Sequence, residues 1–190
     1  MTHHTKVLAI VTNYGVEQDE LLVPVRHLRE NGVQADIAAP DRDEIRTLVR
    51  DKEPGETVRP THTLDEVDAS EYELLLIPGG TVNADTLRLR QEAVDTVLAF
   101  TTSGRPVAAI CHGPWLLAEA GVAYGKRLTS FPSLRTDLAN AGATWADEPL
   151  VTDDANGWRL VTSRNPDDLE HFLHGIDGAL RSRAEAVGPR

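Results

Sequence analysis

Two adjacent side chains, those of Cys111 and His112, offer the clearest chemistry in the sequence. Cys111 is the only cysteine among the 190 residues. A thiolate is a strong nucleophile, and a neighbouring imidazole can carry protons for it. A lone cysteine is nevertheless more often a small buried hydrophobe than a reactive group. Its surroundings must therefore show whether Cys111 lies where a nucleophile would act.

The residues that flank the cysteine predict a strand, a tight turn and a helix. An apolar run at 106–110 ends at Cys111, His112-Gly113-Pro114 follows, and residues 115–120 have helical character. A nucleophile on such a turn projects above the carboxyl edge of a sheet, and Gly113 leaves room for the sharp backbone. The positive end of the helix should lower the pKa of the thiol. This pattern favours a nucleophile over a packing residue.

Composition limits the class of protein and its partners. Hydrophobic residues make up 41% and charged residues 26%, which is typical of a globular protein, and the length favours a single domain over 1–190. The formal net charge of -11 argues against binding to nucleic acid or to an anionic membrane, and favours a small uncharged or cationic ligand. No apolar stretch reaches the roughly 20 residues that cross a bilayer. One cysteine cannot form an internal disulfide, and residues 1–11 do not resemble a signal peptide, so we expect a cytoplasmic protein.

The elements that must position the cysteine follow from an alternation of short apolar runs with amphipathic stretches. This alternation predicts an α/β fold, a doubly wound and mostly parallel sheet of flavodoxin-like type with helices on both faces. Amphipathic helices are expected near 21–28, with a stop at Asn31-Gly32, and near 94–98. The predicted buried strands are 7–11, 34–38, 74–77 and 107–111.

Two segments depart from this alternation. Residues 45–65 hold two short β-like segments around Glu53-Pro54-Gly55, which we interpret as an excursion from the sheet edge. Residues 150–152 and 158–162 flank a stretch that contains Asn156-Gly157, a step that suits a hairpin turn.

The end of the chain predicts one more helix. Asn165 is placed to cap it, and Pro166 suits its first position. The apolar stripe of this helix is lost at about Arg181, so residues 181–190 are expected to form a frayed tail.

The block Ala109-Ile110-Cys111-His112-Gly113-Pro114 resembles the nucleophile motif of the PfpI-like intracellular proteases. That family lies in the class I glutamine amidotransferase-like superfamily, which includes Parkinsonism-associated deglycase. The cysteine block is shared with related amidotransferases, whereas residues 162–169 narrow the resemblance to the PfpI-like branch. Other similar blocks lie in register within residues 6–172, at 76–80, 128–130, 137–143 and 161–169.

The resemblance implies a catalytic set. His112 matches the family's catalytic histidine, and Glu17 matches an acidic residue at the start of the first helix that approaches the cysteine. We expect Glu17 to be protonated, because an ionised carboxylate would raise the pKa of the Cys111 thiol, whereas a protonated one can donate a hydrogen bond to the thiolate. Asp85 best matches the acid that orients the histidine, often from the neighbouring subunit. The alternative for Glu17 and for Asp85 is that each merely favours a helix N-terminus.

Further residues complete the expected site. By resemblance, and because both lie at turns that end strands, Gly80 and His112 should supply backbone N–H groups to an oxyanion. Tyr14 and Trp115 are candidates to line the pocket, although an aromatic residue beside a sheet edge is about as often part of the core.

No cofactor and no metal is predicted. His171 and His174 are spaced to share a helix face, but no third ligand is evident nearby, so a solvated helix is the better interpretation. A flavin-binding role is disfavoured, because residues 12–15 lack a phosphate cradle and Glu17 would occupy the helix end that an anion should use.

Two functions remain open. The resemblance implies a stress-response cysteine hydrolase that acts through Cys111 on a small carbonyl compound, as glyoxalase III and deglycase enzymes do, or on a peptide. The alternative is a non-enzymatic oxidative-stress sensor or protective protein in which Cys111 is oxidised. The resemblance also implies a homodimer or a higher homo-oligomer.

Overall fold

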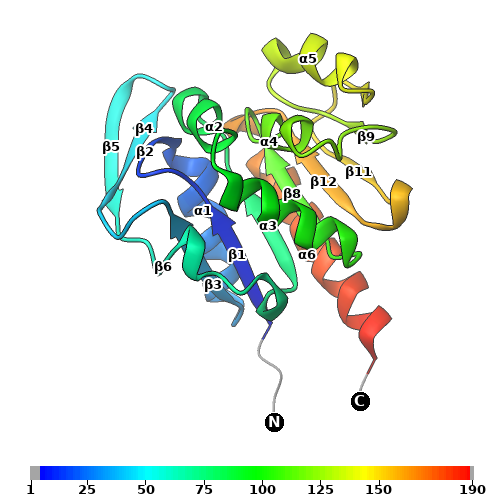
Figure 1. Cartoon of the computed structure of the whole chain (residues 1–190), viewed down its shortest axis with the longest axis horizontal. Coiled ribbons are helices and arrows are strands. Elements are labelled where there is room, and N and C mark those ends of the chain that lie inside the picture. The colour runs from blue at the N-terminus through cyan, green and yellow to red at the C-terminus, as the bar shows by residue number, and fades with distance from the viewer. Residues whose placement is uncertain (1–4, 189–190) are drawn as a thin grey trace.

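The apolar runs of the sequence become the central strands of a seven-stranded sheet in the computed structural model, which describes residues 5–188 (Figure 1). The sheet has the strand order β11-β12-β8-β7-β1-β3-β6. Numbered along the chain, its five central parallel strands lie in the order 2-1-3-4-5, which is the flavodoxin-like arrangement. This confirms the predicted fold and the four predicted buried strands. The central strands are β1 (Lys6–Ile10), β3 (Gln34–Ala39), β7 (Leu74–Ile77), β8 (Val107–Ile110) and β12 (Leu160–Ser163).

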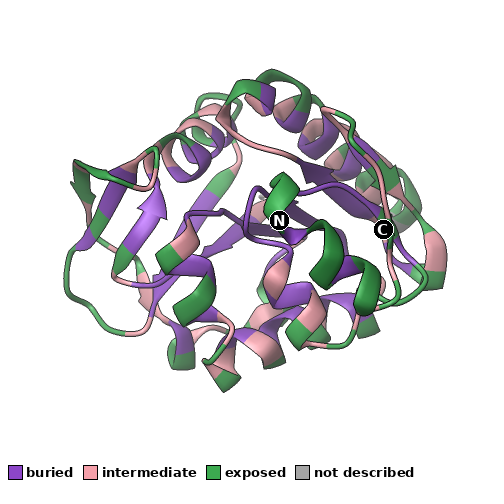
Figure 2. Ribbon diagram, turned by 90° about the horizontal axis from the view of Figure 1, so that it is seen from above, coloured by how far each residue is buried: buried purple, intermediate pink, exposed green. Residues whose placement is uncertain are grey.

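Helices cover both faces of the sheet, because alternate residues of each central strand point to opposite sides. On one face, Leu8 and Ile10 of β1 pack in a cluster with Val97 and Phe100 of α3 (Gln91–Thr102). The other face has Val7 and Ala9 of β1 in a cluster with residues of α1 (Gln18–Glu30) and of α6 (Leu169–Val187). Figure 2 shows the result, with buried strands in the interior and exposed surface on the outer helices. The sheet is therefore buried on both faces, as its continuous apolar runs predict.

A second, three-stranded sheet lies beside the first. It joins β2 (Tyr14–Glu17), β4 (Ile45–Val49) and β5 (Glu53–Val58), with β2 and β4 parallel and β4 and β5 antiparallel. The two β-like segments expected in 45–65 are confirmed. Their turn lies at Arg50-Asp51, however, and Glu53-Pro54-Gly55 lies inside β5. The hairpin is also more than an excursion, because it pairs with the strand that leads into α1.

The C-terminal part of the chain follows the predicted hairpin and helix. Strand β11 (Val151–Asp153) pairs antiparallel with β12, and the side chain of Asn165 accepts a hydrogen bond from the backbone N–H of Asp167 at 2.9 Å. The expected frayed tail is wrong for residues 181–187, which continue α6, and residues 189–190 of that tail lie outside the described residues. Polar contacts from this stretch reach the body of the protein, since Arg183 binds Glu73 at 3.0 Å. None of the helices within residues 5–188 is long and apolar enough to span a membrane.

The remaining elements are short and lie mostly in the connections. Among them, β9 and β10 form a separate parallel pair. The remaining helices and strands are β6 (His62–Thr63), α2 (Thr81–Leu87), α4 (Trp115–Glu119), β9 (Arg127–Leu128), α5 (Arg135–Asn140) and β10 (Thr144–Trp145). Short 3-10 turns lie at Leu64–Glu66, Ala69–Glu71, Pro132–Leu134, Ala155–Gly157 and Pro166–Asp168.

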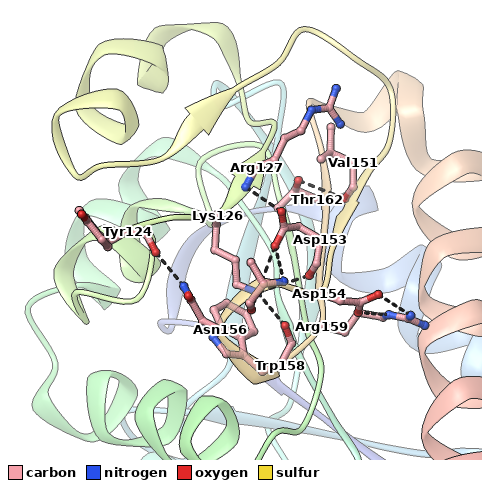
Figure 3. Close-up of polar contacts among 11 residues, drawn as sticks. Tyr124, Lys126, Arg127, Val151, Asp153, Asp154, Asn156, Trp158, Arg159 and Thr162 are labelled. Atoms are coloured by element: carbon pink, nitrogen blue, oxygen red, sulfur yellow. Dashed lines mark hydrogen bonds and ion pairs between the residues drawn. The ribbon is translucent and has the colours of Figure 1, made fainter.

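A buried lysine fixes the loop between β11 and β12. The Lys126 ammonium lies within hydrogen-bond distance of the carbonyl oxygens of Asp153, Ala155 and Trp158, forms an ion pair with the Asp153 carboxylate at 3.3 Å, and lies 3.9 Å from the centre of the Trp158 ring (Figure 3). Its side chain is fully buried. Because a buried charge is costly unless it is paired and hydrogen-bonded, this cluster depends on all of its acceptors.

Replacement of Lys126 by methionine should lower the free energy of unfolding by about 3 kcal/mol, since it removes the donor from the buried carbonyl groups and the cation from Asp153. Urea denaturation measures the change. The matched control is Arg127→Met, which removes an exposed ion pair with Glu148 and should cost less than about 1 kcal/mol. Equal losses in the two variants would contradict this account of Lys126.

Candidate active site

Three strand ends converge at the carboxyl edge of the sheet, beside the point where the strand order reverses. The chain leaves β1 at Thr12, leaves β7 at Gly79-Gly80, and leaves β8 at Cys111. The buried Asn83 side chain joins two of these ends, because it accepts from the Thr12 backbone N–H at 2.7 Å and donates to the Gly79 carbonyl at 2.9 Å. In open α/β sheets this edge is where ligands bind.

Cys111 lies on the expected sharp turn. Its φ of 61° falls in the left-handed region, which is strained for a residue with a side chain. The backbone is tied on both sides, since the Cys111 N–H donates to the Ser163 carbonyl at 3.1 Å and its carbonyl accepts from the Phe131 N–H at 2.9 Å. Only 4% of the residue is exposed. The fold therefore holds one cysteine in a strained conformation at the functional edge.

The carboxyl group that adjoins the thiol belongs to Glu20, and the assignment of this role to Glu17 is wrong. Glu20 is fully buried, and its Oε2 accepts a hydrogen bond from the Gly79 N–H at 2.7 Å. A Cβ on Gly79 would lie 2.4 Å from that oxygen and 2.7 Å from the Cβ of Cys111, so the missing side chain leaves the space in which the two groups meet. The reason for the difference is local: Glu17 is the last residue of β2, whereas Glu20 lies one turn into α1.

Burial and proximity couple Glu20 to Cys111. Burial raises the pKa of Glu20 to about 8, so the carboxyl is largely protonated at neutral pH. The pKa of the Cys111 thiol is raised well above its usual value, first by burial and then by the charge of Glu20. The expectation that the helix end would lower the pKa of this thiol is therefore wrong in direction. The helix that follows has only five residues, and burial outweighs its dipole.

His112 is placed to take the proton from this neutral thiol. Its Nδ1 lies 3.2 Å from the Cys111 Sγ. Burial lowers the pKa of the imidazole, so the ring is neutral near pH 7 and able to act as a base. The ring is stacked on Phe131, with centroids 4.8 Å apart, and meets the edge of Trp115 at 5.4 Å. Trp115 therefore lies against the imidazole, and its role in lining a pocket stays a prediction.

The other imidazole nitrogen faces hydroxyl groups. His112 Nε2 lies 3.3 Å from Thr81 Oγ1 and 3.4 Å from Ser133 Oγ. Thr81 in turn binds Asp51, so the carboxylate behind the histidine comes from the β4–β5 turn. Asp85 lies exposed on α2. The assignment of Asp85 as the acid that orients the histidine within one chain is therefore wrong. The action of Asp85 across a subunit interface stays a prediction.

Glu17 has a different task from the expected one. It is buried, and its two carboxylate oxygens accept the backbone N–H groups of Arg50 and Asp51 at 2.9 and 3.0 Å. Burial raises the pKa of Glu17, and these two hydrogen bonds lower it in part. Glu17 therefore holds the hairpin turn that carries Asp51.

Gly80 lies at the turn that follows β7. The Gly80 backbone N–H opposes the rise in the pKa of the Cys111 thiol. Its φ of 84° and its closeness to the Gly15 carbonyl, 2.2 Å from where a Cβ would lie, exclude a larger residue. The oxyanion role of Gly80 and of the His112 N–H stays a prediction. So does a pocket role for Tyr14, which is 52% exposed.

Comparison with known proteins agrees with this geometry. The family model described as DJ-1/PfpI family matches residues 5–176. The chain belongs to the DJ-1/PfpI family. It is 37% identical over 168 residues to Deglycase PfpI of Pyrococcus furiosus, covering 88% of this chain and 95% of that protein. It is also 35% identical over 167 residues to General stress protein 18 of Bacillus subtilis, and the match covers 88% of this chain and 93% of that protein. Among solved structures, Drosophila melanogaster DJ-1beta superposes with a TM-score of 0.80 at 26% identity, covering 97% of each chain.

Sequence reasoning missed Glu20, Asp51 and Thr81 as members of the site. For Glu20 a usable pattern exists, because it lies in the buried stripe of α1 that Leu21, Pro24, Val25 and Leu28 continue. A carboxyl group in an apolar stripe requires a buried partner. Asp51 and Thr81 have no comparable pattern, since tertiary contacts alone bring the hairpin turn to α2.

The raised pKa of Glu20 predicts how stability depends on pH. Between about pH 4.5 and 8 the unfolded chain carries an ionised Glu20 and the folded protein a protonated one, so unfolding releases a proton. This group therefore contributes stability that is full below about pH 4.5 and falls by up to about 1.4 kcal/mol per pH unit as the pH rises toward 8. Glu20→Gln removes this contribution. The free energy of unfolding is measured by urea denaturation at about pH 5.5 and at about pH 7.5. Between these two pH values, the free energy of unfolding of the variant should rise by about 2 kcal/mol relative to that of the wild type.

Asp19→Asn is the matched control for this experiment, because Asp19 is the exposed carboxylate next to Glu20. Its free energy of unfolding should follow the pH dependence of the wild type. Parallel pH dependences for Glu20→Gln and the wild type would show that Glu20 is ionised in the folded protein.

Proposed function

We propose that this chain is a stress-response cysteine hydrolase that acts on small carbonyl compounds and their adducts, in the manner of a glyoxalase or deglycase. The observation that carries the proposal is the 3.2 Å contact between the Cys111 Sγ and Nδ1 of a buried His112. Family membership supports it, and so does the name of the Pyrococcus furiosus relative, a deglycase. The stress-response role is supported by the name of the Bacillus subtilis relative.

The residues present can carry the chemistry without a further nucleophile. Addition of the Cys111 sulfur to an aldehyde carbon forms a C–S bond, and the thiol proton passes to His112 Nδ1 and then to the new oxygen. For methylglyoxal, the proton on the former aldehyde carbon moves to the neighbouring carbon, and the hydroxyl proton moves to the oxygen of that neighbour. The adduct thereby becomes the thioester of lactate. Attack by water then releases lactate and restores the thiol. The Gly80 N–H beside the sulfur can stabilise the oxyanion of each addition step.

The environment of the thiol favours an enzyme over an oxidation sensor. Oxidation proceeds through the thiolate, and burial raises the pKa of the Cys111 thiol, so the resting protein offers little thiolate to an oxidant. A neutral thiol with a base 3.2 Å away is suited to attack on a bound substrate, because the proton leaves as the C–S bond forms. The aromatic rings of Phe131 and Trp115 and the hydroxyl groups around His112 suit a small uncharged carbonyl compound.

A second activity, the oligomeric state and the cellular compartment complete the proposal. Peptide hydrolysis remains the second activity that the same thiol could perform, since a peptide carbonyl is attacked in the same way. We propose a cytoplasmic homo-oligomer, for which the expected reducing compartment and the family resemblance are the support.

Purified protein should convert methylglyoxal to lactate without glutathione, and Cys111→Ser should reduce the rate by a factor of about 10³ or more. Lactate assayed enzymatically after removal of the protein measures the conversion. The same pair of proteins is compared on a methylglyoxal adduct of N-acetylcysteine and on a fluorogenic peptide. If the wild type turns over none of these faster than Cys111→Ser does, the sensor interpretation replaces the enzyme.

A further inference from the structure

We propose that Asp51 is a positioning residue that acts through the Thr81 hydroxyl to hold His112 in the tautomer that accepts the Cys111 proton. This inference rests on the proposed nucleophilic role of Cys111. It assigns a role to a hairpin that lies outside the central sheet and that sequence patterns do not connect with the site.

A continuous set of contacts joins the hairpin turn to the thiol. Asp51 Oδ1 accepts from the Thr81 backbone N–H at 2.7 Å, and Asp51 Oδ2 accepts from the Thr81 hydroxyl at 2.9 Å. Thr81 Oγ1 lies 3.3 Å from His112 Nε2, and His112 Nδ1 lies 3.2 Å from the Cys111 Sγ. The aspartate therefore reaches the imidazole only by way of the threonine.

The hydrogen-bond donors and acceptors between Asp51 and His112 determine the tautomer of the imidazole. An ionised carboxylate only accepts hydrogen bonds, so the single hydroxyl proton of Thr81 is donated to Asp51. A lone pair of Thr81 Oγ1 then faces Nε2 of His112, and that nitrogen must carry the N–H for a hydrogen bond to form. In a neutral imidazole the other nitrogen, Nδ1, is then unprotonated and free to accept the thiol proton. When the proton has moved, the negative charge of Asp51 favours the imidazolium.

The turn that presents Asp51 is strained, and a buried group holds it. Arg50 and Asp51 both have left-handed backbones, with φ of 54° and 59°. The Lys52 N–H donates to the Val49 carbonyl at 3.3 Å, which closes a β-turn with Arg50 and Asp51 as its central residues, within the three-residue loop that joins β4 and β5. Such turns strongly prefer asparagine and glycine, so Arg-Asp costs conformational energy here. The Glu17 carboxylate offsets this cost by accepting both backbone N–H groups of the turn.

Within residues 5–188, Asp51 is the carboxylate whose charge acts on the His112 ring. The titratable groups that face the ring are Cys111 on its own turn, Glu20 from α1 beside the thiol, and Asp51 from the hairpin. Phe131 and Trp115 cover the ring with aromatic surface. Ser133 Oγ is the competing neighbour of Nε2 at 3.4 Å, and its hydroxyl can either donate or accept.

The decisive experiment measures the His112 tautomer directly. Two-dimensional nitrogen-15 spectra of the imidazole rings distinguish Nε2–H from Nδ1–H, and loss of one signal set in His112→Ala assigns the ring among the seven histidines. In Asp51→Asn the side-chain amide can donate to Thr81, whose hydroxyl is then free to donate to Nε2. We expect the wild type in the Nε2–H form, a shift of Asp51→Asn toward the Nδ1–H form, and a fall in kcat of about 100-fold at pH 7.

Variants of Thr81 separate the proton path from a purely structural effect. Thr81→Val removes the hydroxyl but keeps the backbone N–H that Asp51 binds, so it should preserve the hairpin and still lower kcat. Thr81→Ser restores the hydroxyl and should recover kcat to within about threefold of the wild type. Glu53→Gln, which neutralises an exposed carboxylate on the same hairpin, is the matched control and should leave the tautomer and kcat unchanged.

The spectra keep this inference separate from the proposed function. If Asp51→Asn and Thr81→Val both retain the Nε2–H form and wild-type kcat, the inference is overturned and Ser133 orients the ring, while Cys111-dependent turnover still stands. If the wild type shows no turnover of any carbonyl compound but Asp51→Asn changes the tautomer, the proposed function fails and the positioning role remains.

Discussion

The burial of the Glu20 carboxyl beside Cys111 is the constraint on which the rest of the site depends. A fully buried carboxyl group with one oxygen on the Gly79 N–H and a thiol in the same enclosed space cannot both carry negative charge at low cost. The pair is therefore neutral in the resting protein at neutral pH. A nucleophile made in this way needs a base at the moment of attack, and His112 lies at the right distance from it.

The base is useful only with the correct nitrogen free. A neutral imidazole has two tautomers, and the one with a proton on Nδ1 would face the thiol with a donor instead of an acceptor. The hydroxyl groups on the far side of the ring decide between them, and the Asp51 carboxylate orients one of these hydroxyl groups. The second sheet thus becomes part of the chemistry. Its hairpin lies beside the central sheet in Figure 1, and its turn reaches the start of α2.

One short segment connects these features. Residues 17–20 run from the end of β2 into the first turn of α1, and three of their side chains reach different parts of the site. Glu17 holds the strained hairpin turn, Gln18 accepts the Glu56 backbone N–H of β5 at 2.7 Å, and Glu20 lies against the thiol. Because the residue at the end of a strand and the residues of a helix point in unrelated directions, neighbours in sequence serve separate ends of the same proton path.

The sequence by itself determined the parallel sheet, the strand, turn and helix around Cys111, the adjacent histidine and the Asn165 cap, because each depends on local preference or on short-range periodicity. Only the tertiary structure decided which carboxyl group meets the thiol and which one stands behind the histidine. Glu17 and Glu20 have different roles because β2 ends at Glu17 and α1 begins at Gln18, so the two side chains point in different directions. Asp51 reaches Thr81 through a hairpin whose placement depends on pairing with β2, and no local pattern records such a long-range contact. The direction of the pKa shift of Cys111 was likewise beyond the sequence, since it follows from how completely the fold removes the thiol from water.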